Sequence, residues 1–411
     1  MARLKVLING AGIAGNALAF WLSKLGHDVT IIERFPDLRA TGLQIDLRGH
    51  GIDVIKRMGL EQAFRSRMAP EQGLQVVDSS DRRWAYFPSN KSGSGMQGFT
   101  TDFEIMRGDL CRIIFEEKDD AIEVHYTDGN IDRFDFVVGA DGLGSRTRRK
   151  MVGSGNPDGF HPISGLYTAY FTMPKPIKNG EEYLATAYLA GQGRAVMVRR
   201  ASPDALQVYL LLYRESERLK NARRGDLEEE KAAFVEIYRD AGWRLDEILK
   251  SLEKEVNDFY CERIGLVQLS SWSSGRVVLL GDAAYCPSAT TGMGTTAAIV
   301  GAYILAGEIE SRCGGNHQLD GETQMQSLTT AFKAYQDKFQ PFMDQVQKDV
   351  AQTSKGMFPS SAIAVFVVNL LAAVASLCRI NIAKYILKED VKDWELPEYV
   401  ELRQGAVVNE S

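Results

Sequence analysis

A glycine-rich segment near the N-terminus has residues of the right type and spacing to bind phosphate. Gly10, Gly12 and Gly15 form the pattern G-x-G-x-x-G, and Glu33 lies eighteen residues after Gly15. The first glycine permits a tight turn, the second lets the backbone approach a pyrophosphate, and the third lets a helix pack closely on a strand. The helix N-H groups would bind the phosphates, and Glu33 would accept a hydrogen bond from a ribose hydroxyl. The pattern predicts a dinucleotide site, with an unliganded turn as the alternative, and it does not distinguish NAD from FAD.

The residues around this segment predict the elements that position it. We expect a buried strand over 5–9, a helix over 14–25 that ends at Gly26, and a second strand over 29–33. These elements make one βαβ unit with the glycines in its first turn. The apolar start resembles a signal peptide in composition, but its glycines divide it into strand, turn and helix.

Two later segments also place an acidic residue directly after a predicted strand. The strand over 135–139 leads into G-A-D-G, which contains Asp141, and the strand over 276–280 leads into G-D-A-A, which contains Asp282. An apolar helix is expected over 296–305. Because parallel sheets bind ligands at the carboxyl ends of their strands, Asp282 is expected at a ligand site.

These three segments, in this order and spacing, resemble the family of FAD-dependent, NAD(P)H-using aromatic monooxygenases of the para-hydroxybenzoate hydroxylase type. The spacing is closest to that of tetracycline-inactivating flavin monooxygenases and fungal secondary-metabolite hydroxylases. The resemblance implies an α/β fold, in which a Rossmann-like FAD-binding domain carries an inserted, mostly antiparallel β-sheet substrate domain and a C-terminal helical segment. The expected ranges are 1–155 and 270–350 for the FAD-binding domain, 156–269 for the substrate domain, and 351–411 for the helical segment.

The resemblance and the side-chain chemistry together predict the FAD ligands. The Asp282 carboxylate suits a ribityl hydroxyl, and the helix after the turn at Gly292, Gly294 and Thr295 has a positive dipole end that would stabilise a reduced flavin ring. The resemblance places Asp141 in a segment that contacts both FAD and NAD(P)H. The full predicted set is Gly10, Gly12, Ala14, Gly15, Glu33, Arg34, Asp46, Arg107, Asp141, Asp282, Gly292, Gly294 and Thr295.

Some of these residues have an ordinary structural alternative. Arg107 opens a segment similar to the family's R-x-x-L, in which the arginine contacts the cofactor, but a surface arginine is the alternative. The resemblance places Asp46 near the flavin and Arg39 near the nicotinamide phosphate as the NADPH candidate, whereas they would otherwise be a solvent-facing strand residue and a loop charge. For the basic run 146–150 the alternative is a solvated turn, which is favoured for its last two residues.

The chain departs from the family pattern in two respects. Tyr285 and Thr296 stand where histidine and asparagine are usual. In addition, residues 115–118 run directly into 119–124, without one or two strands that usually help to cover the adenine end. A flavin-binding but inactive or shortened paralogue, or another FAD-dependent oxidoreductase, is therefore the alternative to an active hydroxylase.

The middle of the chain predicts a substrate domain. Its expected elements are strands over 165–172, 183–188, 194–199 and 207–213, followed by a charged helix over 227–241. The resemblance implies that this sheet forms a wall of the substrate site. Tyr170, Arg199 and Tyr213 are the candidate substrate residues, with ordinary sheet packing as the alternative.

One C-terminal segment is long and apolar. Residues 361–378 contain no charge between Lys355 and Arg379, which reaches the length of a membrane span. A buried helix that bridges two domains has the same composition. Burial against the protein or a second subunit is favoured over membrane insertion.

Composition excludes other classes of protein. The formal charge of -6 disfavours a nucleic-acid binder. The five cysteines lie far apart without a C-x-x-C pair, so we expect neither disulfides nor a zinc site, and a reducing, cytoplasmic location. The halogenase pattern W-x-W-x-I-P is absent from the sequence. A plain NAD-dependent dehydrogenase would leave Asp282 unexplained.

The resemblance also implies a reaction. NADPH or NADH would reduce FAD, O2 would add at the flavin C4a position, and the hydroperoxide would transfer one oxygen atom to an aromatic or polyketide-like small molecule. The protein would position the substrate ring and exclude water. No catalytic side chain and no metal are therefore predicted.

Overall fold

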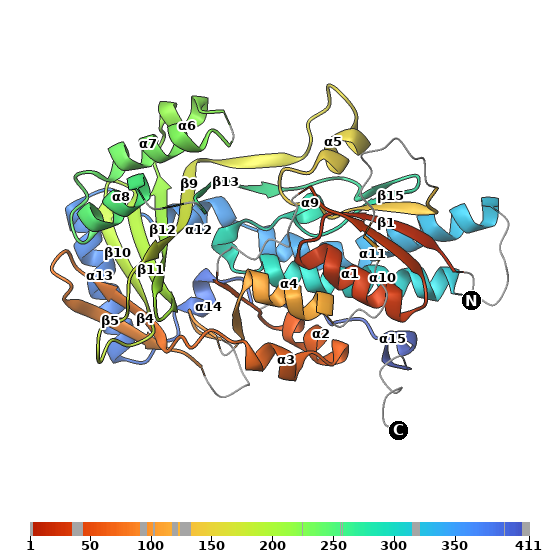
Figure 1. Cartoon of the computed structure of the whole chain (residues 1–411), viewed down its shortest axis with the longest axis horizontal. Helices are drawn as coiled ribbons and strands as arrows, with labels where there is room; N and C mark the ends of the chain where they lie inside the picture. The colour runs from red at the N-terminus through yellow and green to blue at the C-terminus, as the bar shows by residue number, and fades with distance from the viewer. Residues whose placement is uncertain are drawn as a thin grey trace.

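The computed structural model shows an α/β protein whose two large sheets lie in separate lobes (Figure 1). This architecture confirms the expected fold class, including a C-terminal helical segment. The structure describes residues 3–34, 44–90, 97–101, 103–116, 122–123, 133–223, 225–254, 256, 258–314, 321–389 and 391–404.

The first sheet has the strand order β14-β15-β8-β1-β2-β7, and its pairs are parallel except for β14 with β15. The central strands are apolar because a parallel sheet is buried on both faces. Predicted and observed strands agree within about one residue at each end. The strands are β1 (Lys5–Asn9), β2 (Asp28–Ile32), β7 (Ile122–Glu123), β8 (Phe136–Gly139), β14 (Ser273–Ser274) and β15 (Val277–Leu279).

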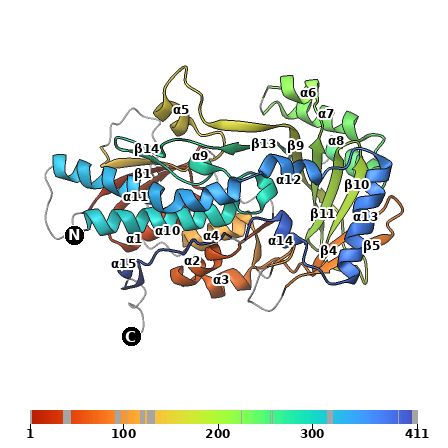
Figure 2. The same cartoon turned by 180° about the vertical axis from the view of Figure 1, so that it is seen from behind.

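Long helices pack beside this sheet. Helix α1 (Ile13–Lys24) packs between α4 (Arg107–Glu116) and α10 (Gly294–Cys313). Helix α10 also packs along α11 (Gly321–Gln347), and Figure 2 shows the two side by side. Helix α10 is buried along most of its length, which explains why its sequence is apolar on every side rather than amphipathic. It extends eight residues beyond the predicted end at residue 305, because neighbouring helices cover its second half as well.

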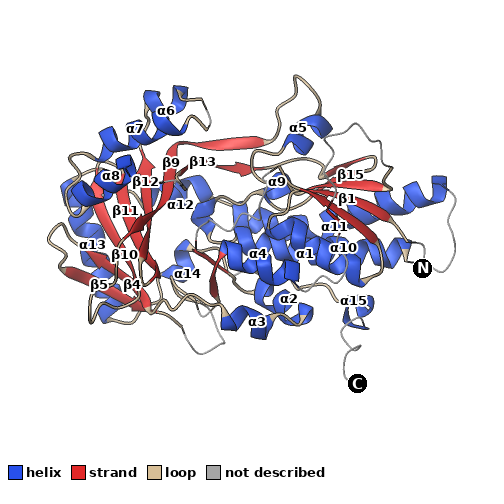
Figure 3. Cartoon of the chain, viewed as in Figure 1, coloured by secondary structure: helices blue, strands red, loops and turns tan. Residues whose placement is uncertain are grey.

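The second sheet has the order β13-β9-β12-β11-β10-β4-β5 and is antiparallel except between β10 and β4 (Figure 3). Helices α7 (Leu227–Tyr238) and α8 (Leu245–Lys254) join one of its faces in a common hydrophobic core. The strands are β4 (Gly73–Val77), β5 (Arg83–Pro88), β9 (Phe160–Pro174), β10 (Leu184–Gly191), β11 (Arg194–Ser202), β12 (Ala205–Tyr213) and β13 (Tyr260–Val267).

The second sheet therefore draws strands from both sides of the expected boundary at residue 155. Strands β4 and β5 come from residues 73–88, which the sequence-based ranges assign to the first part of the FAD-binding domain. The sequence analysis predicts no strands there, and it cannot assign them to a sheet, because the pairing of β4 depends on contact with β10, more than a hundred residues away.

Short elements connect the lobes. A two-stranded sheet of β3 (Gln44–Asp46) and β6 (Glu104–Met106) lies between them. In the sequence, β3 is followed by the helices α2 (His50–Met58) and α3 (Glu61–Ser66). Helices α5 (Arg146–Val152), α6 (Glu217–Asn221) and α9 (Asp282–Tyr285) and the 3-10 turn η1 (Ala289–Thr291) complete the two lobes. The C-terminal helices are α12 (Val350–Gly356), α13 (Ala362–Leu377), α14 (Ala383–Ile386) and α15 (Val400–Gln404).

The apolar segment 361–378 forms α13, which contacts β5 and β10 at the far end of the second sheet. Among the described residues, none of the helices combines the length and the apolar character required to cross a bilayer.

Arg148 joins two turns of the first lobe. It is fully buried, and its guanidinium donates to the Leu143 carbonyl at 2.7 Å, the Ala283 carbonyl at 3.1 Å and the Asp158 carboxylate at 3.2 Å. The solvated alternative is therefore wrong for Arg148, whereas Arg149 and Lys150 are exposed as expected.

We predict that Arg148→Met destabilises the fold by about 3 kcal/mol, because it leaves two carbonyls and a carboxylate without their buried donor. Chemical denaturation followed by circular dichroism measures the change. Arg149→Met is the matched control and should have little effect. Equal stability of the two variants would contradict the linking role.

Candidate functional site

The predicted motifs meet at the carboxyl edge of the parallel sheet. Gly10 follows β1 with φ +116°, and a Cβ atom there would lie 2.5 Å from the Ala140 carbonyl oxygen, directly after β8. Gly281 follows β15 with φ +64°, and its Cβ would lie 2.8 Å from the Cβ of Ala14. Only glycine permits both the backbone angles and this spacing. Three segments separated by more than a hundred residues thus form one site.

The start of α1 fits a pyrophosphate. Its N-cap residue is Gly12, which supplies no side-chain hydrogen bond, and the first turn contains no acidic residue. The first N-H groups of the helix are thus left to a ligand, together with the positive end of its dipole. Arg107, the first residue of α4, places Nη2 3.8 Å from where a Cβ of Gly12 would lie. A guanidinium and a helix N-terminus therefore border the same turn.

Glu33 also lies at this turn. One carboxylate oxygen accepts from the Ala11 N-H at 2.9 Å, and the other accepts from the Arg34 N-H at 2.8 Å. Both Glu33 and Arg34 are exposed. The carboxylate thus borders the glycine turn, at the end of β2 where a ribose hydroxyl would reach it.

Asp282 is the first residue of α9 and follows Gly281, which lies beside Ala14 of α1. Its carboxylate is open to solvent on one side, while protein atoms surround it on the others. This enclosure raises the pKa of Asp282 above the usual aspartate range, against the opposing effect of Arg107. A carboxylate acceptor that follows a glycine turn and lies within the influence of Arg107 suits the hydroxyl groups of a ribityl chain.

The turn before α10 is the second helix start at the site. Helix α10 begins at Gly294 without a side-chain cap or an acidic residue in its first turn, and a Cβ on Gly294 would meet no atom within 4 Å. The adjoining Thr295 is half-buried. The helix therefore presents free N-H groups and a positive dipole end to open space, as binding of an electron-rich ring requires.

Arg48 anchors this turn, and the sequence analysis missed it. Its backbone N-H donates to Thr296 Oγ1 at 3.0 Å, and the same hydroxyl donates to the Arg48 carbonyl at 3.0 Å. Its guanidinium Nε donates to Asp46 at 2.5 Å and lies 3.6 Å from a Cβ built on Gly292. Asp46 thus lies beside this turn, and its position near the flavin stays a prediction. The spacing of two residues between Asp46 and an arginine is the sequence signal that could have identified Arg48.

The C-terminal segment also reaches this turn. Glu389 accepts from Arg48 Nη1 at 3.3 Å and from the Gln97 N-H at 3.2 Å, and burial raises its pKa. Leu387 Cδ2 lies 3.3 Å from a Cβ built on Gly292. No local motif marks Glu389, because its role depends on a contact with Arg48, more than three hundred residues earlier.

Asp141 caps a helix in the structure. Its carboxylate accepts from the Arg146 N-H at 2.7 Å, the Thr147 N-H at 3.1 Å and the Ser145 hydroxyl at 2.5 Å. These contacts fix the start of α5 beside β8. Arg146 is exposed. Direct contact of Asp141 with a cofactor remains a prediction.

The second sheet turns an aromatic face toward β3 and β6. The directly paired residues Tyr260, Tyr170 and Tyr209 lie side by side on this face, because paired residues of an antiparallel sheet share a face. Tyr170 stacks on Tyr260 with ring centroids 6.2 Å apart and meets Tyr209 edge to face at 5.4 Å. Tyr213, the other tyrosine candidate, stacks on Phe358 from the C-terminal segment. Tyr209 was missed, although it lies in a predicted strand.

Arg199 neighbours this aromatic face but binds two buried carboxylates. Its Nε and Nη2 form a bidentate pair with Glu71 at 2.8 and 2.6 Å, and Nη2 also contacts Glu104. Gln44 donates to both carboxylates. Burial raises the pKa of Glu104 to about 8, which Arg199 opposes and Glu71 reinforces. Near neutral pH, Glu104 is therefore mostly protonated.

Two predicted features fall outside the part of the chain that the structure describes. Arg39, and the residues 41–43 before Asp46, lie outside the described residues, as do residues 117–121 of the shortened segment. A search of the described residues found no group of histidine, cysteine, aspartate or glutamate side chains that could bind a metal.

The donor set fits FAD. It combines two uncapped helix starts, a guanidinium at the first, a carboxylate between them, and glycine turns that a side chain would fill. The pyrophosphate matches the start of α1, the ribityl chain matches the Asp282 carboxylate, and the ring system matches the start of α10.

Comparison with known proteins identifies relatives along nearly the whole chain. A family model described as "FAD binding domain" matches residues 3–101 and 115–320. The FAD-dependent monooxygenase asL4 of Sarocladium schorii is 46% identical, with 98% of this chain and 99% of asL4 covered. The flavin-dependent monooxygenase eupH of a Phoma species is 40% identical, with 84% and 85% covered. The crystal structure of the tetracycline destructase Tet(55) matches with a TM-score of 0.74 at 27% identity, with 97% and 99% covered.

We predict that Asp282→Ala lowers the FAD content of the purified protein at least about tenfold, because the enclosed acceptor for the ribityl chain is lost. The ratio of flavin to protein absorbance measures this. Asp204→Ala, at an exposed turn of the second sheet, is the control. An Asp282→Ala variant with full FAD content would refute the assignment.

A second prediction concerns pH. The folded protein binds the Glu104 proton more tightly than the unfolded chain does, since burial raises this pKa from 4.5 to about 8. The stability that Glu104 contributes is therefore complete below its unfolded pKa and is lost as the pH rises through about 8. Glu104→Gln should reduce the loss of melting temperature between about pH 6 and pH 9 by a few degrees. Exposed Glu253→Gln should leave that loss unchanged. The same pH dependence in both variants would show that Glu104 is not the titrating group.

Proposed function

The chain belongs to the FAD binding domain family and is an FAD-dependent monooxygenase, and from this premise we propose that it uses NAD(P)H and O2 to hydroxylate an aromatic or polyketide-like small molecule. Bound FAD would supply the redox chemistry with NAD(P)H and O2. The protein's own residues then have three tasks: to bind the cofactor, to orient the substrate and to exclude water.

One observation carries the proposal: strand β3 connects the turn at Gly292, before α10, with the aromatic face that contains Tyr170 and Tyr209. Asp46, at one end of β3, lies 4.0 Å from a Cβ built on Gly292, and the N-H of Gln44, at the other end, donates to Gln207 of β12 at 3.0 Å. Three residues of extended chain span about 10 Å. The turn proposed for the flavin ring and the tyrosine face thus lie close enough for a substrate ring to contact both.

Individual residues have distinct proposed roles. The start of α1, Arg107 and Asp282 would bind FAD, and the start of α10 would stabilise negative charge on its reduced ring. Tyr170 and Tyr209 would orient an aromatic substrate by ring contacts and limit the access of water. Arg199, paired with Glu71 and in contact with Glu104, would support this face rather than bind a substrate anion.

The relatives support the substrate class. Tet(55) is named for its action on tetracycline, a fused-ring compound, and asL4 and eupH are fungal monooxygenases. We also propose roles for the domain ranges predicted from the sequence. Residues 1–155 and 270–350 would bind FAD, and 156–269, joined by β4 and β5, would form the substrate wall.

The proposal predicts three linked results for the purified protein. It should show oxidised-flavin absorption bands, which NADPH or NADH bleaches in the absence of O2. With a matching substrate from a panel of phenols and fused-ring polyketides, it should form a product carrying one oxygen atom from 18O-labelled O2, measured by mass spectrometry.

Tyr209→Phe tests the aromatic face in the same assay. It keeps the ring contact with Tyr170 but loses the hydroxyl that donates to Gln207 at 3.1 Å, so we expect a moderate rise in KM. Tyr209→Ala should reduce kcat/KM much further. Flavin reduction with hydrogen peroxide as the only product across the panel would instead favour the inactive or shortened paralogue.

A further inference from the structure

Exposed apolar side chains are concentrated on one helix. Of the ten large hydrophobic residues that are exposed in the described part of the chain, eight lie on α13 and just after it. Their side chains are 44 to 85% exposed. We call this set the α13 face: Ile363, Phe366, Val367, Leu370, Leu371, Val374, Leu377 and Ile380.

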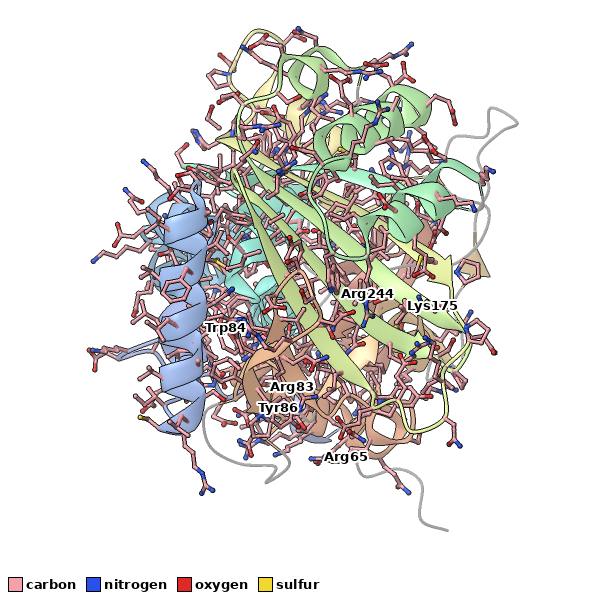
Figure 4. The ribbon with its side chains drawn as sticks, turned by 90° about the vertical axis from the view of Figure 1, so that its left-hand side faces the viewer. Arg65, Arg83, Trp84, Tyr86, Lys175 and Arg244 are labelled. Carbon is pink, nitrogen blue, oxygen red and sulfur yellow. The ribbon has the colours of Figure 1, made fainter. Side chains whose placement is uncertain are left out.

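The opposite side of α13 already has a partner. Strand β5 is the edge of the second sheet, and Ser376 Oγ accepts from the Tyr86 N-H at 3.1 Å and donates to the Tyr86 carbonyl at 2.7 Å. The buried residues of the helix, Asn369, Ala372 and Ala375, are small or polar, and Phe366 meets Trp84 of β5 edge to face with ring centroids 5.7 Å apart. Figure 4 shows α13 as the blue helix beside the sheet, with Trp84 next to it.

The arrangement reverses that of an ordinary surface helix, which turns its apolar side inward and its polar side to water. Here most of the large apolar side chains are exposed. Soluble monomers rarely expose an apolar patch larger than roughly 300–600 Å². The α13 face has an area on the order of the ~800 Å² that one partner contributes to a standard protein interface.

The spacing of these residues fits a second copy of the same helix. Ile363, Val367, Leu370, Val374 and Leu377 follow one another at intervals of four, three, four and three residues, the pattern of a helix-helix seam. A two-fold axis near Leu370 would place Ile363 opposite Leu377 of the second copy, and Val367 opposite Val374. The seam is thus complementary to itself when two helices run antiparallel, and no charged residue between 361 and 378 interrupts it.

The charges around the face favour a protein partner over a lipid surface. Arg82, just before the adjoining strand β5, pairs with Asp78 at 2.9 Å, and Arg83 of β5 pairs with Glu182 at 3.6 Å. A polar rim of balanced charge is typical of protein interfaces, whereas helices that lie on membranes have a basic rim that binds anionic lipids. The formal charge of -6 also opposes such lipids.

We propose that this chain forms a homodimer in which the α13 faces of two copies pack antiparallel around a two-fold axis. The interface lies at the outer edge of the second sheet, on the opposite side of β5 from the lobe that contains α1. Each copy keeps a complete FAD site.

Sedimentation velocity over a concentration series of the full-length FAD-bound protein tests this directly. We expect a dimer with a dissociation constant in the micromolar range or tighter. Leu370→Glu with Leu371→Glu should raise that constant at least about 100-fold, since two charges would be buried in the seam. Leu227→Glu, at a residue 43% exposed on α7, is the matched control and should remain dimeric. A monomeric wild type, or a double variant as dimeric as the control, would overturn the proposal.

A charge-pair experiment tests the antiparallel arrangement without relying on loss of assembly. Ile363→Lys alone and Leu377→Glu alone should each weaken the dimer. The combined variant should recover it, because each new lysine would face a glutamate of the other copy. Recovery supports the proposed axis. No recovery, with FAD content and circular dichroism unchanged, would overturn the antiparallel arrangement.

Flotation with vesicles of phosphatidylcholine containing one-fifth phosphatidylserine tests whether the α13 face binds a lipid surface instead of a second copy of the chain. We expect the wild type to remain in the protein fraction. A wild type that is monomeric and floats with the vesicles, while the Leu370→Glu and Leu371→Glu variant does not, would replace the dimer by a lipid-binding face.

Discussion

The close approach of backbone segments at the carboxyl edge of the parallel sheet is the constraint on which the site depends. Gly10 meets Ala140, and Gly281 meets Ala14, at distances that leave no room for a side chain. These contacts bring the starts of α1 and α9 together, so that Arg107 and Asp282 influence the same space. The FAD site exists because the sheet aligns three strand ends that are remote in sequence.

Two buried arginines connect this edge to the rest of the molecule. Arg48 links the α10 turn to Asp46 and to Glu389 of the C-terminal segment. Arg199 links the second sheet to Glu104 of β6. A buried charge must be paired, and a guanidinium can donate to several acceptors at once. The two arginines therefore fix how the aromatic face lies relative to the turn before α10. Burial, reinforced by Glu71 and Asp46, raises the pKa of Glu104.

The C-terminal segment serves both ends of the molecule. Its helix α13 covers the edge strand β5, whose unpaired backbone groups would otherwise invite association with other strands. The chain then returns to the first lobe, where Leu387 lies beside Gly292 in the turn before α10 and Glu389 contacts Arg48. The covering helix leaves its own large side chains outward, so protection of one edge creates the apolar surface that a second copy fits.

The sequence by itself determined the elements and the cofactor. The glycine pattern with Glu33, and Asp282 after a strand, are local arrangements whose chemistry is the same wherever they occur, and their predicted strands agree with the structure. Only the tertiary structure decided which of the remaining residues meet. Arg48 with Glu389, Arg199 with Glu104, and β4 with β10 are pairs separated by roughly a hundred residues or more, and no local pattern encodes them. The apolar run 361–378 shows the same limit: its composition predicts a helix, but which side contacts the protein depends on the edge strand it covers.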